Sequence, residues 1–244
     1  MNEEVFLKNI KLPTKTYFLR TFPFIQLEKQ LNSNQKKILL EQIFSRGIQI
    51  LAVINEKNTN IPKYEDENVR FDAISFLMIK VKNLKKSVQI YKIFALIMPM
   101  PLIILFYDNK QTNWVFGLHE KRKDLTLSLK KTFEIGEELN LEHVESKLDF
   151  NCLDKTNLKI FYLSWLEALL SLELEKCYGI KKKITVEDNI LEKLKKLDSQ
   201  IFTFSKNAKK EKQMNLSIEW SMKKNKLKAE KALLISKERD IDDE

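Results

Sequence analysis

A run of fifteen consecutive apolar residues, from Ile93 to Tyr107, dominates the hydrophobic pattern of the chain. Pro99 and Pro101 interrupt this run, and a proline lacks an amide donor and pushes the preceding residue toward an extended conformation. A membrane-spanning helix needs about 20 apolar residues, whereas shorter runs are typical of a buried core. The run therefore predicts two core elements, an amphipathic helix over residues 84–98 and a buried strand over residues 102–107, and no membrane span.

The apolar and polar positions around this pair predict further helices and strands. Asn32 is a suitable N-cap for a helix that would run to Arg46, with Gly47 as its stop. Runs rich in β-branched and apolar residues predict strands over residues 48–55, over 69–81 and from Thr112 onward. The resulting order of helix, strand, strand, helix, strand, strand predicts an α/β (α+β) domain in which helices flank a mixed β-sheet.

The pattern of residues 125–151 is ambiguous and is compatible with a strand followed by a surface excursion. Residues 156–179 carry a clear apolar stripe at helical spacing, and Gly179 stands where a helix C′ residue is expected. This segment predicts a helix that packs against the sheet and closes an α/β domain over residues 1–180.

Beyond that helix the composition shifts to lysine and glutamate. Apolar residues from Ile190 to Phe204 step by four and three, as in a short coiled-coil seam, and a second helix is predicted over residues 211–237. Residues 181–244 hold 17 basic and 12 acidic side chains. They are therefore predicted to form a basic, coiled-coil-like helical arm.

The composition narrows the classes of protein to consider. The net charge is +9, from 43 basic and 34 acidic residues. A positive field of this size attracts nucleic acid, anionic lipid headgroups and acidic proteins. A biased genome composition would give the same excess of lysine. The four glycines form no phosphate-binding GxxxxGK[ST] or GxGxxG motif. The two cysteines fit a reducing compartment, and the N-terminus lacks a secretory pattern, so we expect a cytoplasmic protein.

One catalytic interpretation is a nuclease. The predicted order of elements resembles the core of restriction endonucleases, in which carboxylates and a lysine hold Mg²⁺ and activate water. Asp72, Lys80 and Lys82 are the candidates for this chemistry, with further oxygen ligands from the acidic segment 65–67. However, the strand reads Met-Ile-Lys where the second carboxylate is required, so we expect no catalytic residues, and a degenerate or divergent Mg-dependent nuclease is the alternative.

Zinc and nucleophilic sites are also disfavoured. His119, His143, Cys152 and Cys177 are four zinc-ligand types, but no two of them lie within four residues of each other, as zinc knuckles and helical pairs require. Cys152 with His143 is a nucleophile pair by residue type alone. We therefore expect no metal site and no cofactor.

Two segments are candidates for binding rather than catalysis. Aromatic residues between Leu12 and Gln30 alternate with cations, and they would either stack on nucleic acid bases or, as we favour, cover the edge of the core: Tyr17, Phe18, Phe22 and Phe24. In the arm, three lysine clusters are candidate contacts to nucleic acid, although a run of charge is more often a solvated surface: Lys181, Lys182, Lys183, Lys209, Lys210, Lys212, Lys223 and Lys224.

The arm also carries a thin set of apolar residues that are candidates for partner binding: Met214, Ile218, Trp220 and Met222. An isolated helix is marginally stable in water, so these residues must meet the protein's own core, a second copy or a partner. We favour a partner or self-association.

Several short motifs resemble the bacterial and archaeal family called domain of unknown function 4391: NTNIP at 58–62, MPMPLIILFYDN at 98–109, WVFGLHEKR at 114–122 and NLSIEWSMKKNKL at 215–227. The strand after the NTNIP loop has Asp72 where the family often has glutamate, and Met100 stands inside the Pro-x-Pro. The resemblance implies a companion of helicases and DNA methyltransferases in restriction-like defence loci. The expected function is therefore a non-catalytic accessory subunit of a bacterial DNA-transaction or anti-phage defence complex, with a protein partner such as a helicase or methyltransferase subunit.

Overall fold

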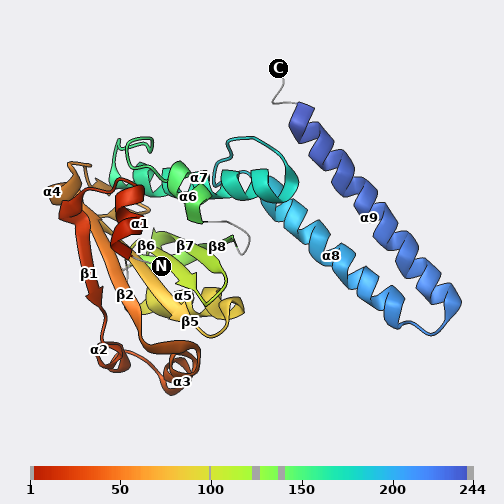
Figure 1. Ribbon diagram of the computed structural model, residues 1–244, viewed down its shortest axis with the longest axis horizontal. Helices are drawn as coiled ribbons and strands as arrows, with labels where there is room; N and C mark the ends of the chain where they lie inside the picture. The colour runs from red at the N-terminus through yellow and green to blue at the C-terminus, as the bar shows by residue number, and fades with distance from the viewer. Residues whose placement is uncertain (1–2, 99, 123–126, 137–140, 241–244) are drawn as a thin grey trace. The chain divides into compact units, whose positions relative to one another are not determined.

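The computed structural model describes residues 3–98, 100–122, 127–136 and 141–240 (Figure 1). The chain divides into two compact units, Met1–Leu169 and Leu170–Glu244, which we call the sheet unit and the hairpin unit. The sequence placed a division at residue 180, whereas the division in the structure falls inside α7, Leu158–Tyr178. The two units are described separately below.

The sheet unit is built on a six-stranded mixed sheet, which confirms the expected fold class. The strands lie in the order β1-β2-β5-β6-β7-β8, and their bounds are β1 Tyr17–Thr21, β2 Ile43–Asn55, β5 Ala73–Val81, β6 Leu102–Tyr107, β7 Thr112–Lys121 and β8 Leu127–Ile135. β5 and β6 are parallel and are joined by α5, Ser87–Ile97, while the other neighbouring pairs are antiparallel. The prediction of a strand over residues 102–107 is confirmed residue for residue.

Smaller elements surround this sheet. The remaining elements of the unit are α1 Glu3–Asn9, η1 Thr14–Thr16, α2 Phe24–Glu28, α3 Ser33–Gln42, α4 Glu56–Thr59, β3 Tyr64–Glu65, β4 Arg70–Phe71, η2 Leu84–Lys86 and α6 Leu141–Lys147. β3 and β4 pair as a separate two-stranded sheet. α3 begins with a reciprocal capping box, because Asn32 and Gln35 each accept the backbone N–H of the other.

Several boundaries differ from those predicted, and two of the differences change how residues are interpreted. The helix that begins after Asn32 ends at Gln42 rather than at Arg46, because Ile43 already pairs with Val81 of β5. Gly47 is consequently not a helix stop but part of an irregular stretch of β2. A Cβ there would lie 2.7 Å from the Phe44 carbonyl oxygen and 3.0 Å from the Lys80 carbonyl oxygen, so close backbone approach explains the glycine. The strand predicted over residues 69–81 is divided at Asp72 into β4 and β5.

Apolar layers cover both faces of the sheet. On one face α3 and α5 contribute to a cluster with Leu77, Ile79, Ile104 and Phe106. On the other face the rings of Phe76 and Trp114 stack with centroids 5.7 Å apart, and α1 and α7 add Phe6 and Trp165 in edge or tilted contacts. Leu102 to Phe106 are fully buried, which confirms the core interpretation of the apolar run. Among the described residues no helix is long and apolar enough to cross a membrane.

The hairpin unit consists of the end of α7, a loop, α8 Ile190–Lys210 and α9 Met214–Asp240. α8 and α9 run side by side in opposite directions (Figure 1). The predicted helix end at Gly179 is confirmed, because Gly179 has a φ of 66° and follows the last residue of α7. Arg239, near the end of α9, donates hydrogen bonds to the carbonyl oxygens of Tyr178 and Gly179 at 2.7 and 3.1 Å.

Candidate interaction surface on the helical hairpin

Ion pairs fix the hairpin at the end where α8 begins and α9 finishes, which we call the root. Lys231 binds Asp198 at 2.5 Å, and the Tyr178 hydroxyl donates to the same carboxylate at 2.9 Å. Lys182 binds Glu238 at 2.8 Å. Burial, together with the neighbouring Asp198 carboxylate, raises the pKa of Tyr178, so the phenol remains a protonated donor. The root therefore has roughly balanced charge and a defined set of contacts.

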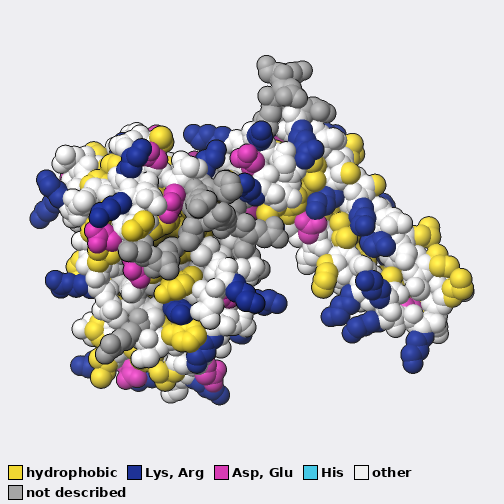
Figure 2. Space-filling view, in the orientation of Figure 1, with side chains coloured by type: hydrophobic (Ala, Val, Ile, Leu, Met, Phe, Trp, Pro, Cys, Tyr) yellow, Lys and Arg dark blue, Asp and Glu magenta, His cyan; other side chains and the backbone are white. Residues whose placement is uncertain are grey.

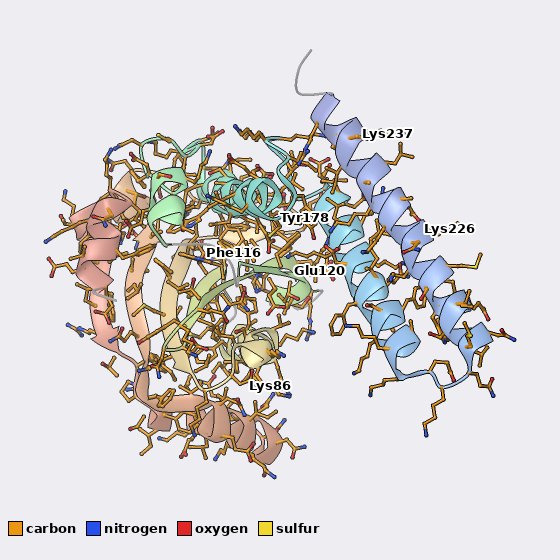
Figure 3. The ribbon with its side chains drawn as sticks, turned by 45° about the vertical axis from the view of Figure 1, so that its right-hand side comes forward. Lys86, Phe116, Glu120, Tyr178, Lys226 and Lys237 are labelled. Atoms are coloured by element: carbon orange, nitrogen blue, oxygen red, sulfur yellow. The ribbon has the colours of Figure 1, made fainter. Side chains whose placement is uncertain are left out.

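The opposite part of the hairpin, residues 199–229, is strongly basic, and we call it the tip half. Its acidic residues are Glu211 and Glu219, against eight lysines: Lys206, Lys209, Lys210, Lys212, Lys223, Lys224, Lys226 and Lys228. Figure 2 shows dark blue and yellow side chains side by side over this part, with little magenta. Lys226 lies on the side of α9 turned away from α8 (Figure 3). The fold thus gathers positive charge from the end of α8 and the start of α9.

The structure brings two of the three predicted lysine clusters into the tip half. Lys209, Lys210 and Lys212 flank the connection between the helices, and Lys223 and Lys224 lie along α9. The cluster from Lys181 to Lys183 lies at the root, roughly 30 Å away along α8 at 1.5 Å per residue. Sequence reasoning omitted three single lysines of the tip half because it considered only runs of lysine: Lys206 on α8, and Lys226 and Lys228 on α9.

The predicted partner-binding residues separate into two positions. Met214, Ile218 and Met222 are 78%, 49% and 67% exposed, and their four-residue spacing places them on one face of α9, which we call the outer face. Trp220 instead contacts Phe204 of α8, with ring centroids 5.5 Å apart, and the Lys223 ammonium lies 4.8 Å from its ring. Trp220 therefore stabilises the hairpin, while the other three residues are accessible.

The candidate nuclease residues are not brought together. Asp72 precedes β5, whereas Lys80 lies near the end of that strand and Lys82 follows it, so eight residues of extended chain separate Asp72 from Lys80, about 26 Å. Asp72 pairs with Arg70 at 2.5 Å, and the Lys80 ammonium lies 5.1 Å from the Phe44 ring centroid. No shared metal site can be formed by groups at this separation.

The acidic segment near Asp72 is engaged in ordinary structural contacts. Glu65 binds Lys121 at 2.8 Å. Asp66 accepts a hydrogen bond from the Tyr64 hydroxyl at 2.8 Å and also accepts backbone N–H groups, and these hydrogen bonds lower the pKa of Asp66 to about 2. Its carboxylate thus holds the turn between β3 and β4 in place.

The residue types considered for zinc are dispersed. His119 is buried in β7, Cys152 is exposed after α6, and Cys177 belongs to the hairpin unit, while the His143 side chain lies outside the described residues. Within the described parts of the chain, no three His, Cys, Asp or Glu side chains lie close enough together to hold a metal ion.

Comparison with known proteins identifies a family without assigning an activity. The chain belongs to the family described as Domain of unknown function (DUF4391), whose model matches residues 10–230. No curated protein matches the chain. No solved structure matches it either.

Proposed function

We propose that this member of the DUF4391 family is a non-catalytic binding subunit of a bacterial DNA-transaction or anti-phage defence complex, and that it contacts nucleic acid and a protein partner through its hairpin. The observation that carries the proposal is the charge of the tip half, eight lysines against two glutamates in 31 residues. The balanced root of the same hairpin shows that this excess is concentrated, because ion pairs to Asp198 and Glu238 lie at the other end.

A polyanion is the natural ligand of such a surface. Each lysine that neutralises a phosphate of duplex DNA releases condensed counterions, so the logarithm of the binding constant falls with the logarithm of the salt concentration by about 0.9 per contact. Lysine acts as a point charge and carries no base preference by itself. The tip half therefore supports binding that depends strongly on salt and weakly on sequence.

The outer face of α9 supports a protein contact beside the nucleic acid. Met214, Ile218 and Met222 form an exposed apolar stripe at helical spacing, and Leu233 is 58% exposed further along the helix. Stripes of this kind pack into a groove or against a partner helix. A helicase or methyltransferase subunit is the class of partner we propose, since a second copy would bring one lysine-rich tip half against another.

Charge reversal tests the role of the tip half. Changing Lys209, Lys210 and Lys212 to glutamate is expected to weaken binding to duplex DNA at least ten-fold at about 0.1 M salt, and to make the salt slope shallower by about 3. Fluorescence anisotropy at several salt concentrations measures both quantities.

A matched variant tests whether the position of the lysines, rather than the net charge of the protein, determines DNA binding. Changing Lys181, Lys183 and Lys193 to glutamate alters the charge of the root by the same amount, and a change several-fold smaller is expected. Equal losses in the two variants would mean that only the overall field attracts DNA, and unaltered binding by the tip variant would contradict the proposal. Cleavage of DNA in Mg²⁺ that is lost on Asp72→Ala would overturn the non-catalytic assignment in favour of the nuclease alternative.

A further inference from the structure

A hollow of about 370 Å³ lies at the β1 edge of the sheet unit and is lined by residues of that unit. Residues from the end of β1, from α2 and from the junction of α3 and β2 line it, and the lining is largely apolar: Thr21, Phe22, Pro23, Phe24, Leu39, Leu40, Ile43, Phe44, Ser45, Gly47 and Ile48. Pockets for small ligands have volumes of about 300–1,000 Å³, so the hollow is large enough to accept a single ring system or side chain.

Two exposed phenylalanines at this edge each carry a cation over the ring. Phe44, which lines the hollow, is 40% exposed and has the Lys80 ammonium 5.1 Å from its centroid. Phe18, on β1, is 43% exposed and has the Arg20 guanidinium carbon 5.1 Å from its centroid. Phe22 and Phe24 instead pack partly against the core, as the sequence indicated for aromatic residues at a core edge. A partly exposed ring beside a cation is the arrangement that stacks a base and holds its phosphate.

Irregular backbone occurs at both exposed rings. The pairing of β1 with β2 shifts register between Tyr17 and Arg20, and Leu19 within this shift has a φ of 46°, a conformation that is strained for a residue other than glycine. The pairing of β2 with β5 shifts between Ile43 and Ile48, which encloses Phe44. Bulges re-aim side chains and are frequent beside functional sites. Here they accompany the two rings that the sheet leaves accessible.

The surrounding charge favours an anionic ligand. Residues 15–49 contain Glu28 and Glu41 as their acidic residues, against six basic ones, and Glu41 lies 3.9 Å from Lys37. Lys80 and Lys82 add positive charge from the end of β5. Apolar ring surface, cations over that surface and a net positive edge together match a nucleobase with its phosphate.

From this geometry we infer that the β1 edge is a stacking site for single-stranded nucleic acid, in which one base enters the hollow against Phe44, another stacks on Phe18, and Arg20 and Lys80 contact the phosphates. The inference rests on the proposed nucleic-acid function and adds a second contact surface to it. The proposed hairpin contact rests on charge, whereas the β1 edge is expected to respond to the base itself.

An oligonucleotide that lacks bases provides a direct test on the full-length protein. A single-stranded oligothymidine and an abasic strand of the same length carry the same charge, and the wild-type protein is expected to bind the former about ten-fold more tightly. Phe44→Leu keeps the apolar volume but removes one of the two rings, so it is expected to reduce this preference to about three-fold while leaving the salt slope unchanged. Ile25→Ala, at a 70% exposed position of α2 outside the hollow, is the control and should keep the preference.

A spectroscopic variant reports the same contact without relying on loss of binding. Phe44→Trp is expected to bind oligothymidine as wild type does, and the added indole emission should be quenched by the oligothymidine and not by the abasic strand. Equal binding of both strands by the wild type, or quenching absent in Phe44→Trp, would overturn the stacking site even if the tip-half variant still loses DNA affinity. An apolar side chain of a protein partner would then be the occupant of the hollow.

Discussion

Gly117→Ala is expected to lower the free energy of unfolding of the sheet unit by about 3 kcal/mol, at the upper end of the usual cost of overpacking a core. A Cβ at this position would lie 2.6 Å from the Tyr91 hydroxyl oxygen and 2.9 Å from a Tyr91 ring carbon, and 2.5 Å from a methyl group of Leu129. The leucine end can rotate away. The tyrosine cannot do so readily, because it is fully buried and its hydroxyl donates to the Leu102 carbonyl oxygen at 3.0 Å.

A second tyrosine makes this position still less tolerant. The Tyr162 hydroxyl accepts a hydrogen bond from the Gly117 N–H at 3.0 Å. It donates its own proton to the carbonyl oxygens of Leu102 and Gly117, each 3.0 Å away. β6 begins at Leu102, so the hydroxyl completes the hydrogen bonding between β6 and β7 where the ladder ends. Burial raises the pKa of both phenols, which keeps them protonated as donors. Any movement of β7 away from Tyr91 would disturb these bonds.

Thermal and denaturant unfolding measure the effect. For a unit of this size a loss of 3 kcal/mol corresponds to a decrease in Tm of roughly 6–12 °C. Thr112→Ala, at the partly exposed first residue of β7, is the control and should change stability by less than about 1 kcal/mol. Tyr91→Phe removes the atom at 2.6 Å, so the double variant should be more stable than the sum of the two single changes predicts. Strict additivity would contradict a direct clash with Tyr91.

The pattern of apolar and polar residues was enough to predict the elements whose ends are determined by residues next to them in the sequence. The strand Leu102–Tyr107 follows from a continuous apolar run that begins after Pro101 and is closed by Asp108 and Asn109. α7 follows from its apolar stripe and its glycine stop. In both cases the residues that end the element are adjacent to it.

The same pattern did not predict features that depend on contacts between residues far apart in the sequence. Ile43 and Phe44 continue the helical spacing of α3, and only the pairing of Ile43 with Val81 converts them to strand. The hydroxyl of Tyr162 reaches Gly117 across 45 positions, which no local pattern shows. The sequence predicted a strand through Gly117 but gave no reason for a glycine there, whereas the structure shows that a Cβ would clash with Tyr91.

The candidate interaction surface could be predicted only in part, because it too depends on contacts between residues far apart in the sequence. The four-residue spacing of Met214, Ile218 and Met222 identified an apolar face of α9, but a helix pattern does not say which of its faces meets α8. The structure places Trp220 toward Phe204 and leaves the other stripe exposed. Likewise, the three lysine clusters were treated as one candidate surface, although the length of α8 separates the root cluster from the tip half.

The stability of the sheet unit is expected to fall by about 3 kcal/mol as the pH decreases from about 6.5 to about 4, because of His119. His119 is buried in β7, and neither of its ring nitrogens makes a well-formed hydrogen bond among the described residues, so the weak interaction with the Gly117 backbone does not offset burial. Burial disfavours the imidazolium and lowers the pKa of His119 to about 4 from its ordinary value of 6.5. Above pH 6.5 the imidazole is neutral in both the folded and the unfolded protein, so the full stability is present.

Below pH 6.5 the unfolded chain takes up a proton that the folded protein takes up only near pH 4. Stability is therefore lost progressively through this interval, and the contribution of His119 becomes constant below it. The pKa of Asp66 is lowered to about 2 and that of Glu65 is also lowered, so the stabilising contributions of these carboxylates are lost chiefly at lower pH than that of His119. The upper part of the interval, from pH 6.5 to about 5, is thus the most diagnostic for the histidine.

His119→Phe separates this contribution from the others. It replaces the imidazole with an apolar ring that fits a buried site without hydrogen-bond partners, and it should flatten the dependence of the unfolding free energy on pH between 6.5 and 5. The chain contains two histidines, so His143→Gln is the matched control and should keep the slope of the wild type. Urea unfolding at half-unit pH steps measures the slope. If His119→Phe retains the wild-type slope, His119 takes up its proton equally in the folded and the unfolded protein, and the buried neutral imidazole is wrong.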